Sequence, residues 1–481
     1  MSMRQIRKIK PIIKISQSRR CFNIRELYSI ILLGLIVTIG FYLRANHLTQ
    51  SPPGFYIDEA SIGYNAYSIL KTGRDEHGVK FPLFFQAFGD YKNPVYIYSL
   101  VPLVKMFDLE IATVRLNSAI WGTLGILAMF WMAWEFSKNK VVSLLAAAIL
   151  AVTPWHLHYS RLGFEAISFP TLLTTAISAF MGWKRTKNNL MGMIACLSLT
   201  LAFFSYSTAR LWLPLVAGFF VWLYWKQSNN LKHFWPLAAA VLMIGGLLIY
   251  GRHSTPDGLT ARLNQISIWS DHPGYLEIGH RFWNTFWQHW TIRFLFLSGD
   301  PNLRHSSQVN SELLLSLGAI SFLGAGIIWN NFKSRQAWKL VLLMIGLFPL
   351  AASLTKTDPI ATRTLQAVPF FSLAGAVGIR WMGQKLWKSR RFFTAWLIIL
   401  ALTVSLEFGS YYYDLINRYP VRAWNWFDGN VSGLISEEKT VLPDQIHQIY
   451  IQGLFFMKAD PVKWQTSKQA PFIIKKTDIN D

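Results

Sequence analysis

The sequence predicts an all-α polytopic membrane protein, from its composition, the spacing of its apolar segments and the placement of its charges. Of its 481 residues, 52% are hydrophobic, 15% aromatic and only 15% charged, which is far from the composition of a soluble globular domain. The net charge of +22 falls in short clusters between apolar runs of about 17 to 22 residues, the length of helix that crosses a bilayer. The basic charge therefore indicates membrane topology, and nucleic acid is not expected as a partner.

About eleven transmembrane helices are predicted with a hydropathy window near 19 residues. They are expected at 27–43, 112–135, 141–155, 166–182, 190–205, 211–225, 234–250, 312–330, 338–354, 365–382 and 392–409. We interpret the first as a retained span, because it ends in FYLRANHLTQ without a small-residue cleavage site. The two cysteines, Cys21 and Cys196, indicate neither a disulfide framework nor a metal site.

Basic residues in alternate connections set the predicted orientation. The clusters are KNK at 138, KRTK at 184, KQSNNLK at 226, KSRQAWK at 333 and KLWKSRR at 385, together with the N-terminal tail. The positive-inside rule makes these segments cytoplasmic. Only Glu26 and Glu135 among the carboxylates fall on that side, and every histidine except His233 lies at or beyond the outer ends of the spans. The chemically versatile side chains are therefore expected on the outer face of the plasma membrane, with the N-terminus in the cytoplasm.

Three parts of the chain follow from this topology. Residues 1–26 form a basic cytoplasmic tail, and 27–409 form the transmembrane domain, with outer loops at 44–111 and 251–311. Residues 410–481 form a C-terminal tail of about 70 residues, which is small for an independent domain and is expected to pack on the outer face.

Two aromatic segments of the outer loops are expected at the membrane surface. Segment 94–109 is long enough for a short span, but as a span it would turn every later basic cluster outward, so we place it on the surface. Segment 274–297 has aromatic residues at helical spacing among His and Arg, which is typical of a helix lying on lipid and fits a rim for a lipid substrate. An anchoring belt without a role in binding is the open alternative.

The stretch FYIDEASIGYNAYSIL, at 55–70, contains the adjacent carboxylates Asp58 and Glu59. An acid pair before an apolar pattern that ends at Gly73 is typical of a helix start and stop, and Glu59 suits the helix dipole. The same loop continues to Asp90 and Lys92 in GDYKNPVYIY. Carboxylates beside a lysine at a bilayer surface can deprotonate a hydroxyl and hold a phosphate, so a structural and a catalytic role are both open.

Several motifs together carry a resemblance to a known family. They are DEA at 58, GDYKNPVYIY at 89, ATVRLNSAIWGTLGIL at 112, TPWHLHYSRLGFEA at 153, SYSTARLWLPL at 205, FLSGDPNLRHSS at 296 and TKTDPIATRTLQAVPFF at 355. In this order they resemble the bacterial branch of the dolichyl-phosphate-mannose protein mannosyltransferase family, which includes aminoarabinose transferase-like enzymes. The resemblance covers about residues 27 to 375. It implies a GT-C glycosyltransferase fold, a polyprenyl-phosphate sugar as donor and transfer with inversion on the outer face.

The resemblance also implies roles for individual residues. The first acid of the pair, Asp58, corresponds to the catalytic base, and Glu59 is the second catalytic candidate, in a supporting role. Lys92 corresponds to a lysine that binds the donor phosphate in a KPP motif. This chain reads Lys92-Asn93-Pro94, so the first proline is missing, which weakens local rigidity but keeps the charge. No P-loop or dinucleotide-binding turn is present, as expected for a donor that the membrane delivers.

Other candidates come from the outer segments. Cations suited to the departing phosphate are Arg161, Arg304 and Arg363, with interfacial anchoring, a tight turn and surface charge as their respective alternatives. Possible substrate-binding residues are His158, Asp90, Tyr91, Asp300 and His305. The sequence indicates no specific cofactor; a divalent cation at Asp90 is left open, although one carboxylate without paired histidines is a weak signal. The expected partners are the lipid-linked donor, the bilayer and a protein or glycan acceptor.

Two other functions fit a polytopic chain. A lipid or sugar-lipid transporter would place ionisable residues at mid-membrane depth, whereas the predicted spans contain almost no charge. A non-catalytic lipid-binding homologue would not need Asp58 and Lys92. The sequence therefore favours the enzyme, without specifying its sugar or its acceptor.

Overall fold

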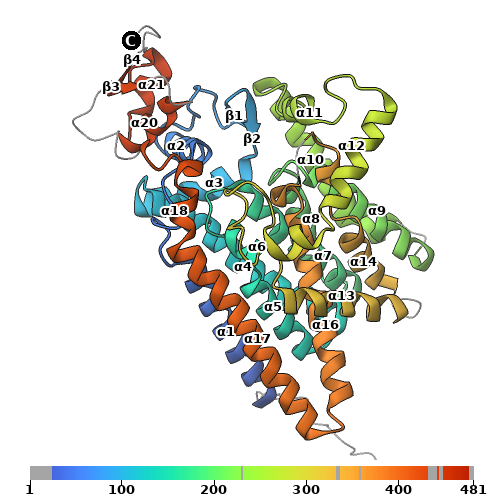
Figure 1. Ribbon diagram of the computed structural model, residues 1–481. Helices are drawn as coiled ribbons and strands as arrows, with labels where there is room; N and C mark the ends of the chain where they lie inside the picture. The colour runs from blue at the N-terminus through green and yellow to red at the C-terminus, as the bar shows by residue number, and fades with distance from the viewer. Residues whose placement is uncertain are drawn as a thin grey trace, which may run out of the picture.

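The computed structural model describes residues 24–228, 231–331, 336–356, 359–431, 441–443 and 448–475. Long helices form a bundle, and short helices with two small two-stranded sheets gather at one end of it, which is uppermost in Figure 1 and is called the upper end below. Most of the expected N-terminal tail, Cys21 included, lies outside the described residues.

Each of the eleven expected spans contains a helix. These are α1 (Ile24–Ala45), α4 (Ile111–Ser137), α5 (Lys140–Val152), α7 (Ser168–Thr186), α8 (Asn189–Phe203), α9 (Ala209–Ser228), α10 (Trp235–Ser254), α13 (Leu315–Asn331), α14 (Lys339–Gly346), α16 (Val368–Leu386) and α17 (Arg390–Asn417). The helix at 338–354 is broken, because α14 ends at Gly346 and α15 (Leu350–Ser353) begins after Pro349.

Five helices of the described chain are long and apolar enough to cross a membrane, namely α1, α4, α7, α10 and α17. The chain is therefore a multi-pass membrane protein, whereas the count of about eleven spans stays a prediction, since six further apolar helices have only 10–17 residues. The apolar window of α7 is 94% buried and that of α17 is 0% buried. Helix α7 therefore lies at the centre of the bundle, and the apolar window of α17 is exposed on its outside.

Small residues allow the central helices to approach closely. Helix α7 packs on α4 and α8, and α13 packs on α16. A Cβ atom at Gly324 of α13 would collide with the carbonyl of Ala374 in α16, and one at Gly378 would collide with Ile320. This is the small-residue packing that membrane helices use.

The upper end is built from the segments expected in the outer loops and the C-terminal tail, together with the adjoining ends of the expected spans 141–155, 166–182 and 365–382. They are α2 (Ile57–Thr72), β1 (Phe85–Ala87), β2 (Asp90–Lys92), α3 (Pro94–Phe107), α6 (Pro154–Tyr159), η1 (Glu165–Ile167), α11 (Ala261–Ile266), α12 (Tyr275–Gln288), η3 (Arg293–Leu297), η5 (Ala361–Arg363), η6 (Leu365–Ala367), α18 (Tyr419–Ala423), η7 (Trp424–Phe427), β3 (Val441–Pro443), α20 (Ile449–Phe456), α21 (Pro461–Ser467) and β4 (Ile473–Lys475). Strands β1 and β2 are antiparallel, with Phe85 opposite Lys92. Helix α3 buries one face through Tyr96, Ile97 and Leu100; its place at the membrane surface stays a prediction.

The C-terminal segment packs against α2. Helix α17 continues to Asn417, beyond the end expected at 409, and the chain returns to the upper end. There α20 lies on α2 (Figure 1), and Gln452 of α20 donates a hydrogen bond to the carbonyl of Phe55 at 2.9 Å. The tail thus packs on a segment of the loop 44–111, just before the acid pair.

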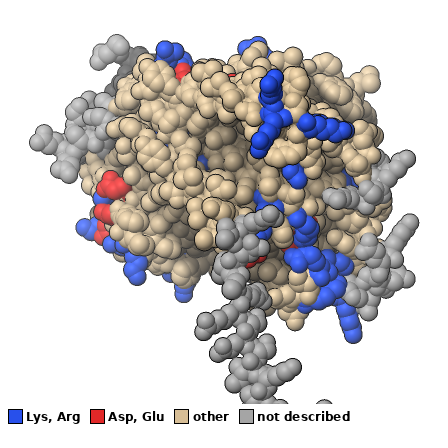
Figure 2. All heavy atoms as spheres, turned by 90° about the horizontal axis from the view of Figure 1, so that it is seen from below, with Lys and Arg blue, Asp and Glu red and all other residues tan. Residues whose placement is uncertain are grey.

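Basic side chains predominate among the charges of the lower face. Figure 2 views this face directly and shows mainly Lys and Arg among its charged residues. The carboxylates expected on this side are paired: Glu135 contacts Lys138 and Arg185, and Glu26 lies 3.6 Å from Lys140. This distribution agrees with the positive-inside pattern, and the orientation in a membrane remains a prediction.

Candidate functional site

A cavity of about 640 Å³ lies at the upper end, where residues far apart in the sequence meet. Its polar and charged lining residues are Tyr56, Asp58, Asp90, Tyr91, Lys92, Glu165, Tyr206, Ser207, Thr208, Arg210, Arg262, Gln265, His305, Thr355, Thr362 and Arg363. They come from the starts of α2 and α9, from β2, η1, α11 and η5, and from the loop after η3. Asp58, Lys92, Asp90, Tyr91, His305 and Arg363 are thus brought together as lining residues of one cavity.

Asp58 and Lys92 form an ion pair in this cavity. Asp58 lies in the first turn of α2, and Lys92 ends β2, whose pairing with β1 fixes its backbone. The Lys92 Nζ donates to Asp58 Oδ1 at 2.7 Å, and the two side chains are 15% and 38% exposed. The carboxylate is therefore accessible from the cavity while a cation holds its orientation.

The charges around Asp58 keep it ionised. Burial raises its pKa, but the ion pair and hydrogen bond with Lys92, together with Arg262 and Arg304, outweigh burial, and the net pKa is lowered. Asp58 is consequently deprotonated at neutral pH and has the charge state that a general base needs.

Glu59, one residue further, does not line the cavity. It is fully buried, and Arg115 of α4 donates to both its oxygens, from Nε to Oε1 at 2.9 Å and from Nη2 to Oε2 at 2.8 Å. The backbone N–H of Gly163 also donates to Oε1 at 2.8 Å, and that of Tyr56 to Oε2 at 3.3 Å, as in a capping box. This position gives Glu59 a structural role and offers no support for a catalytic one.

Arg161 and His158 are also outside the cavity, which differs from their expected roles. Arg161 is 1% exposed and donates to backbone carbonyls, among them those of Leu43 and Ser51, each at 2.8 Å. His158 is buried, and its Nε2 lies 3.1 Å from the carbonyl of Arg304. Both side chains therefore bond to backbone carbonyls of neighbouring segments, and neither lines the cavity.

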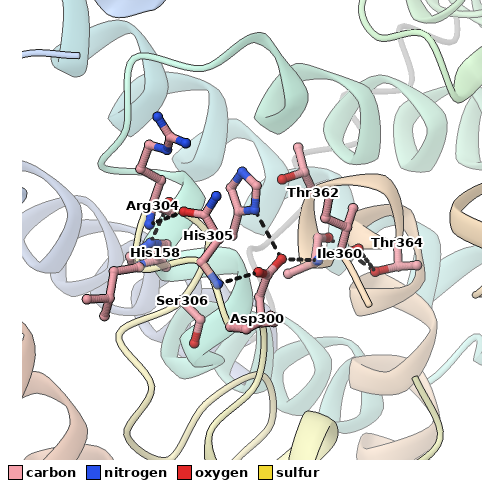
Figure 3. Close-up of polar contacts among 12 residues, drawn as sticks. His158, Asp300, Arg304, His305, Ser306, Ile360, Thr362 and Thr364 are labelled. Atoms are coloured by element: carbon pink, nitrogen blue, oxygen red, sulfur yellow. Dashed lines mark hydrogen bonds and ion pairs between the residues drawn. The ribbon is translucent and has the colours of Figure 1, made fainter. Parts of the chain in front are cut away.

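Asp300 connects two segments that border the cavity. Its Oδ2 accepts from the N–H of Ala361 at 2.8 Å and lies 3.1 Å from His305 Nδ1, while Oδ1 accepts from the N–H of Asn302 at 2.8 Å. Figure 3 shows Asp300 between His305 and the segment 360–364. Asp300 is buried, so it supports the lining residues His305 and Arg363 rather than reaching the cavity itself.

The two remaining arginine candidates differ in position. Arg363 lines the cavity at 7% exposure and donates to the hydroxyl of Thr355. The guanidinium of Arg304 stacks on the ring of Tyr56, with its Cζ 4.1 Å from the ring centre. It does not line the cavity, but its charge contributes to the lowered pKa of Asp58.

Three charged lining residues were not found by sequence reasoning. Arg262 donates to Asp90 Oδ2 at 2.9 Å, and Glu165 and Arg210 both contact Asn93. Glu165 and Arg210 lie inside motifs quoted for the resemblance, but only the fold shows that they meet. Arg262 belongs to none of these motifs, so no sequence signal singled it out.

The side chains around Asp90 do not provide the ligands that a resident divalent cation needs. Asp90 is neutralised by Arg262, and the described residues contain no group of three or more His, Cys, Asp or Glu side chains that could hold a metal ion. A hard cation requires several oxygen ligands, which the single carboxylate of Asp90 does not supply.

Comparison with solved structures identifies the fold. No family model and no curated protein matches the sequence. The apo oligosaccharyltransferase of Archaeoglobus fulgidus matches with a TM-score of 0.59 at 14% identity, over 87% of this chain and 59% of that one. The apo aminoarabinose transferase ArnT of Cupriavidus metallidurans matches with a TM-score of 0.54 at 10% identity, over 94% of this chain and 90% of that one.

These identities show the fold alone. The chain has the GT-C fold, which confirms that part of the expectation, while the mannosyltransferase branch is not confirmed. The chain spans 59% of the length of the archaeal oligosaccharyltransferase, compared with 90% for ArnT.

Proposed function

We propose that the protein is a membrane glycosyltransferase that moves a sugar from a polyprenyl-phosphate donor to an acceptor on the outer face of the plasma membrane. The observation that carries the proposal is the accessible Asp58 carboxylate, paired at 2.7 Å with Lys92, in a cavity with further cations. The fold supports it, because structures of GT-C neighbours include a complex with dolichol-phosphate and one with undecaprenyl phosphate.

The cations of the cavity suit the donor phosphate. Lys92, Arg262 and Arg363 line it, and ammonium and guanidinium groups form strong charge-assisted hydrogen bonds with phosphate oxygens. In the structure Lys92 donates to Asp58. A bound phosphate would compete for this amine, which would make the carboxylate more basic when the donor is present.

The proposed reaction is a single displacement. The acceptor hydroxyl or amine attacks the anomeric carbon and passes its proton to Asp58, while the bond from that carbon to the phosphate oxygen breaks and its electron pair stays on the polyprenyl phosphate. The configuration at the anomeric carbon is inverted. A positioned general base contributes about 10² to 10⁴ in rate, and the cations stabilise the charge that develops on the departing phosphate.

Helix α12 supports access from lipid. Tyr275, Trp283 and Trp287 are 94%, 54% and 61% exposed, whereas Arg281 pairs with Glu277 and Asp271. A helix with exposed aromatic residues and a charged side is suited to the membrane interface. It therefore provides a lipid-contacting element near the cavity for a donor with a long hydrocarbon tail.

The test is transfer by the purified full-length protein in liposomes. A panel of radiolabelled polyprenyl-phosphate sugars is supplied with envelope extract, and nucleotide sugars serve as the control donors. We expect label to move to an acceptor from a lipid-linked donor, with an inverted anomeric linkage, and not from nucleotide sugars. Folded protein that transfers from no lipid donor would refute the proposal, and movement of intact labelled lipid across the bilayer would favour a transporter.

A further inference from the structure

Asn93 occupies a helix N-cap but does not cap the helix. It precedes Pro94, the first residue of α3, and has φ −79° and ψ 146°. Asparagine at this position usually accepts a hydrogen bond from the first helical turn, yet its side chain makes no such bond here. The N–H of Val95 instead donates to the carbonyl of Phe204 at 3.4 Å. The Asn93 side chain is therefore directed elsewhere.

Asn93 is held by two other segments. Its backbone N–H donates to Glu165 Oε2 and its Nδ2 donates to Glu165 Oε1, both at 2.7 Å. Arg210 Nη2 donates to Asn93 Oδ1 at 2.9 Å, and Arg210 Nη1 donates to the carbonyl of Leu259 at 3.1 Å. Asn93 is 1% exposed, so its side of these contacts is shielded from competing water, while Glu165 and Arg210 also line the cavity.

We infer that Glu165 and Arg210 are positioning residues that act through Asn93 to hold Lys92 in the reactive arrangement. This inference rests on the proposed function. Lys92 is adjacent to Asn93, and its own strand has only three residues, which is little support for a side chain that must reach both Asp58 and a phosphate. Misplacement of a reactive group by about 1 Å can lower a rate about a hundredfold. The contacts of Glu165 and Arg210 with Asn93, which together form a clamp on this residue, are therefore expected to affect the rate of transfer.

The clamp also explains how the junction is made rigid without a proline at position 93. Proline would fix φ near −65° and has no N–H. Asn93 has a compatible φ of −79°, but its free rotation and two buried donors must be constrained. The two oxygens of Glu165 accept from both donors. Glu165 is thus required because residue 93 is asparagine, and a proline there would make it dispensable.

The experiment compares E165Q, N93P and the double variant E165Q/N93P in the liposome transfer assay. Glutamine leaves one acceptor for two donors, so we expect kcat/KM of E165Q to fall about tenfold to a hundredfold. In the double variant both donors of residue 93 are absent, its φ is fixed, and Arg210 keeps its hydrogen bond to the carbonyl of Leu259, so activity should return to within about threefold of wild type. A double variant as impaired as E165Q would overturn the inference.

The matched control is Glu76→Gln. Glu76 is also buried and accepts from an asparagine, Asn65, at 3.1 Å, and its own N–H donates to Asn65 Oδ1 at 3.0 Å. It does not touch the Lys92 junction. We expect E76Q to keep kcat/KM within about threefold of wild type, since it neutralises a comparable buried carboxylate away from Lys92. A loss equal to that of E165Q would show a general effect of destabilisation and would overturn the assignment.

A second readout needs no substrate. Lys92 is 15% exposed and is held by Asp58, so its reaction with an amine reagent, followed by mass spectrometry, reports on its position. We expect faster labelling in E165Q, and a smaller increase in R210Q, which remains informative if E165Q does not fold. Unchanged labelling in both variants would overturn the clamp. If wild type transfers no sugar, the labelling still decides the clamp, and the proposed function alone fails.

Discussion

Asp58 and Glu59 are neighbours in the first turn of α2, and each pairs with a cation, but the two sites differ in accessibility. Asp58 is 38% exposed in a cavity, with the hydrogen bond from Lys92 on one oxygen. Glu59 has no exposure, and both its oxygens accept hydrogen bonds from Arg115 and from backbone N–H groups. An accessible carboxylate with spare accepting capacity can take a proton, whereas a buried and saturated one stabilises the fold.

The largest effect on stability is expected from E59Q. This change leaves Arg115 buried without its counter-ion, and breaking a buried ion pair costs about 3–5 kcal/mol. The free energy of unfolding, measured by denaturant titration in detergent, should fall by that amount, while D58N should change it far less. The double variant E59Q/R115M should recover part of the loss, because it removes the unpaired charge. Equal destabilisation by E59Q and D58N would remove the distinction between the two acids.

K92Q should reduce transfer strongly without unfolding the protein. Hydrogen bonds to charged groups contribute about 1.5–3 kcal/mol, so loss of the lysine contact with the donor phosphate should lower kcat/KM about tenfold or more. K92R keeps the charge and should retain more activity than K92Q. If both variants transfer as fast as wild type, Lys92 does not contact the donor.

The pH dependence of transfer tests whether Lys92 lowers the pKa of Asp58 in the working enzyme. Burial raises the pKa of Asp58, but Lys92, Arg262 and Arg304 lower it below the ordinary value for aspartate. Since the ionised form is the base, kcat/KM of wild type should fall only at acid pH, as the pH drops through this lowered pKa. In K92Q the acid limb should move to higher pH. An acid limb at the same pH in both proteins would exclude Asp58 as the titrating group.

The smallest effect is expected from R262Q. The Arg262–Asp90 pair joins side chains that are 46% and 21% exposed, and such surface pairs contribute about 0–1 kcal/mol to stability. Thermal unfolding should therefore hardly change, while KM for the donor should rise a few-fold through loss of one cation from the cavity. A loss of stability as large as that of E59Q would mean that this pair is structural.

Periodic and local features could be predicted from the sequence. Each of the eleven apolar runs expected to span the membrane contains a helix. The order of motifs also pointed to Asp58 and Lys92, which are 34 positions apart in the sequence and form an ion pair in the structure. The resemblance to the GT-C fold could therefore be stated from the sequence alone. Apolar runs and short motifs consist of residues that are close together in the sequence, so they can be recognised without the fold.

Pairings set by the fold could not be predicted. Glu59 pairs with Arg115, 56 residues further along the chain, and Asp90 pairs with Arg262, 172 residues further. No periodicity in the sequence encodes such contacts. Arg161 has a guanidinium group that could bind phosphate, but it donates to backbone carbonyls instead. A side chain's charge indicates what it can bind, and only its surroundings decide what it does bind.

Asp58 is the residue that we propose to remove the acceptor proton. The most direct test is single-turnover transfer from preloaded donor by wild type and D58N, since asparagine keeps the size of the side chain and removes its basicity. In D58N we expect the transfer step to slow by at least about a hundredfold, while the variant still binds the donor. Equal single-turnover rates in the two folded proteins would contradict it and would leave Asp58, like Glu59, a structural residue.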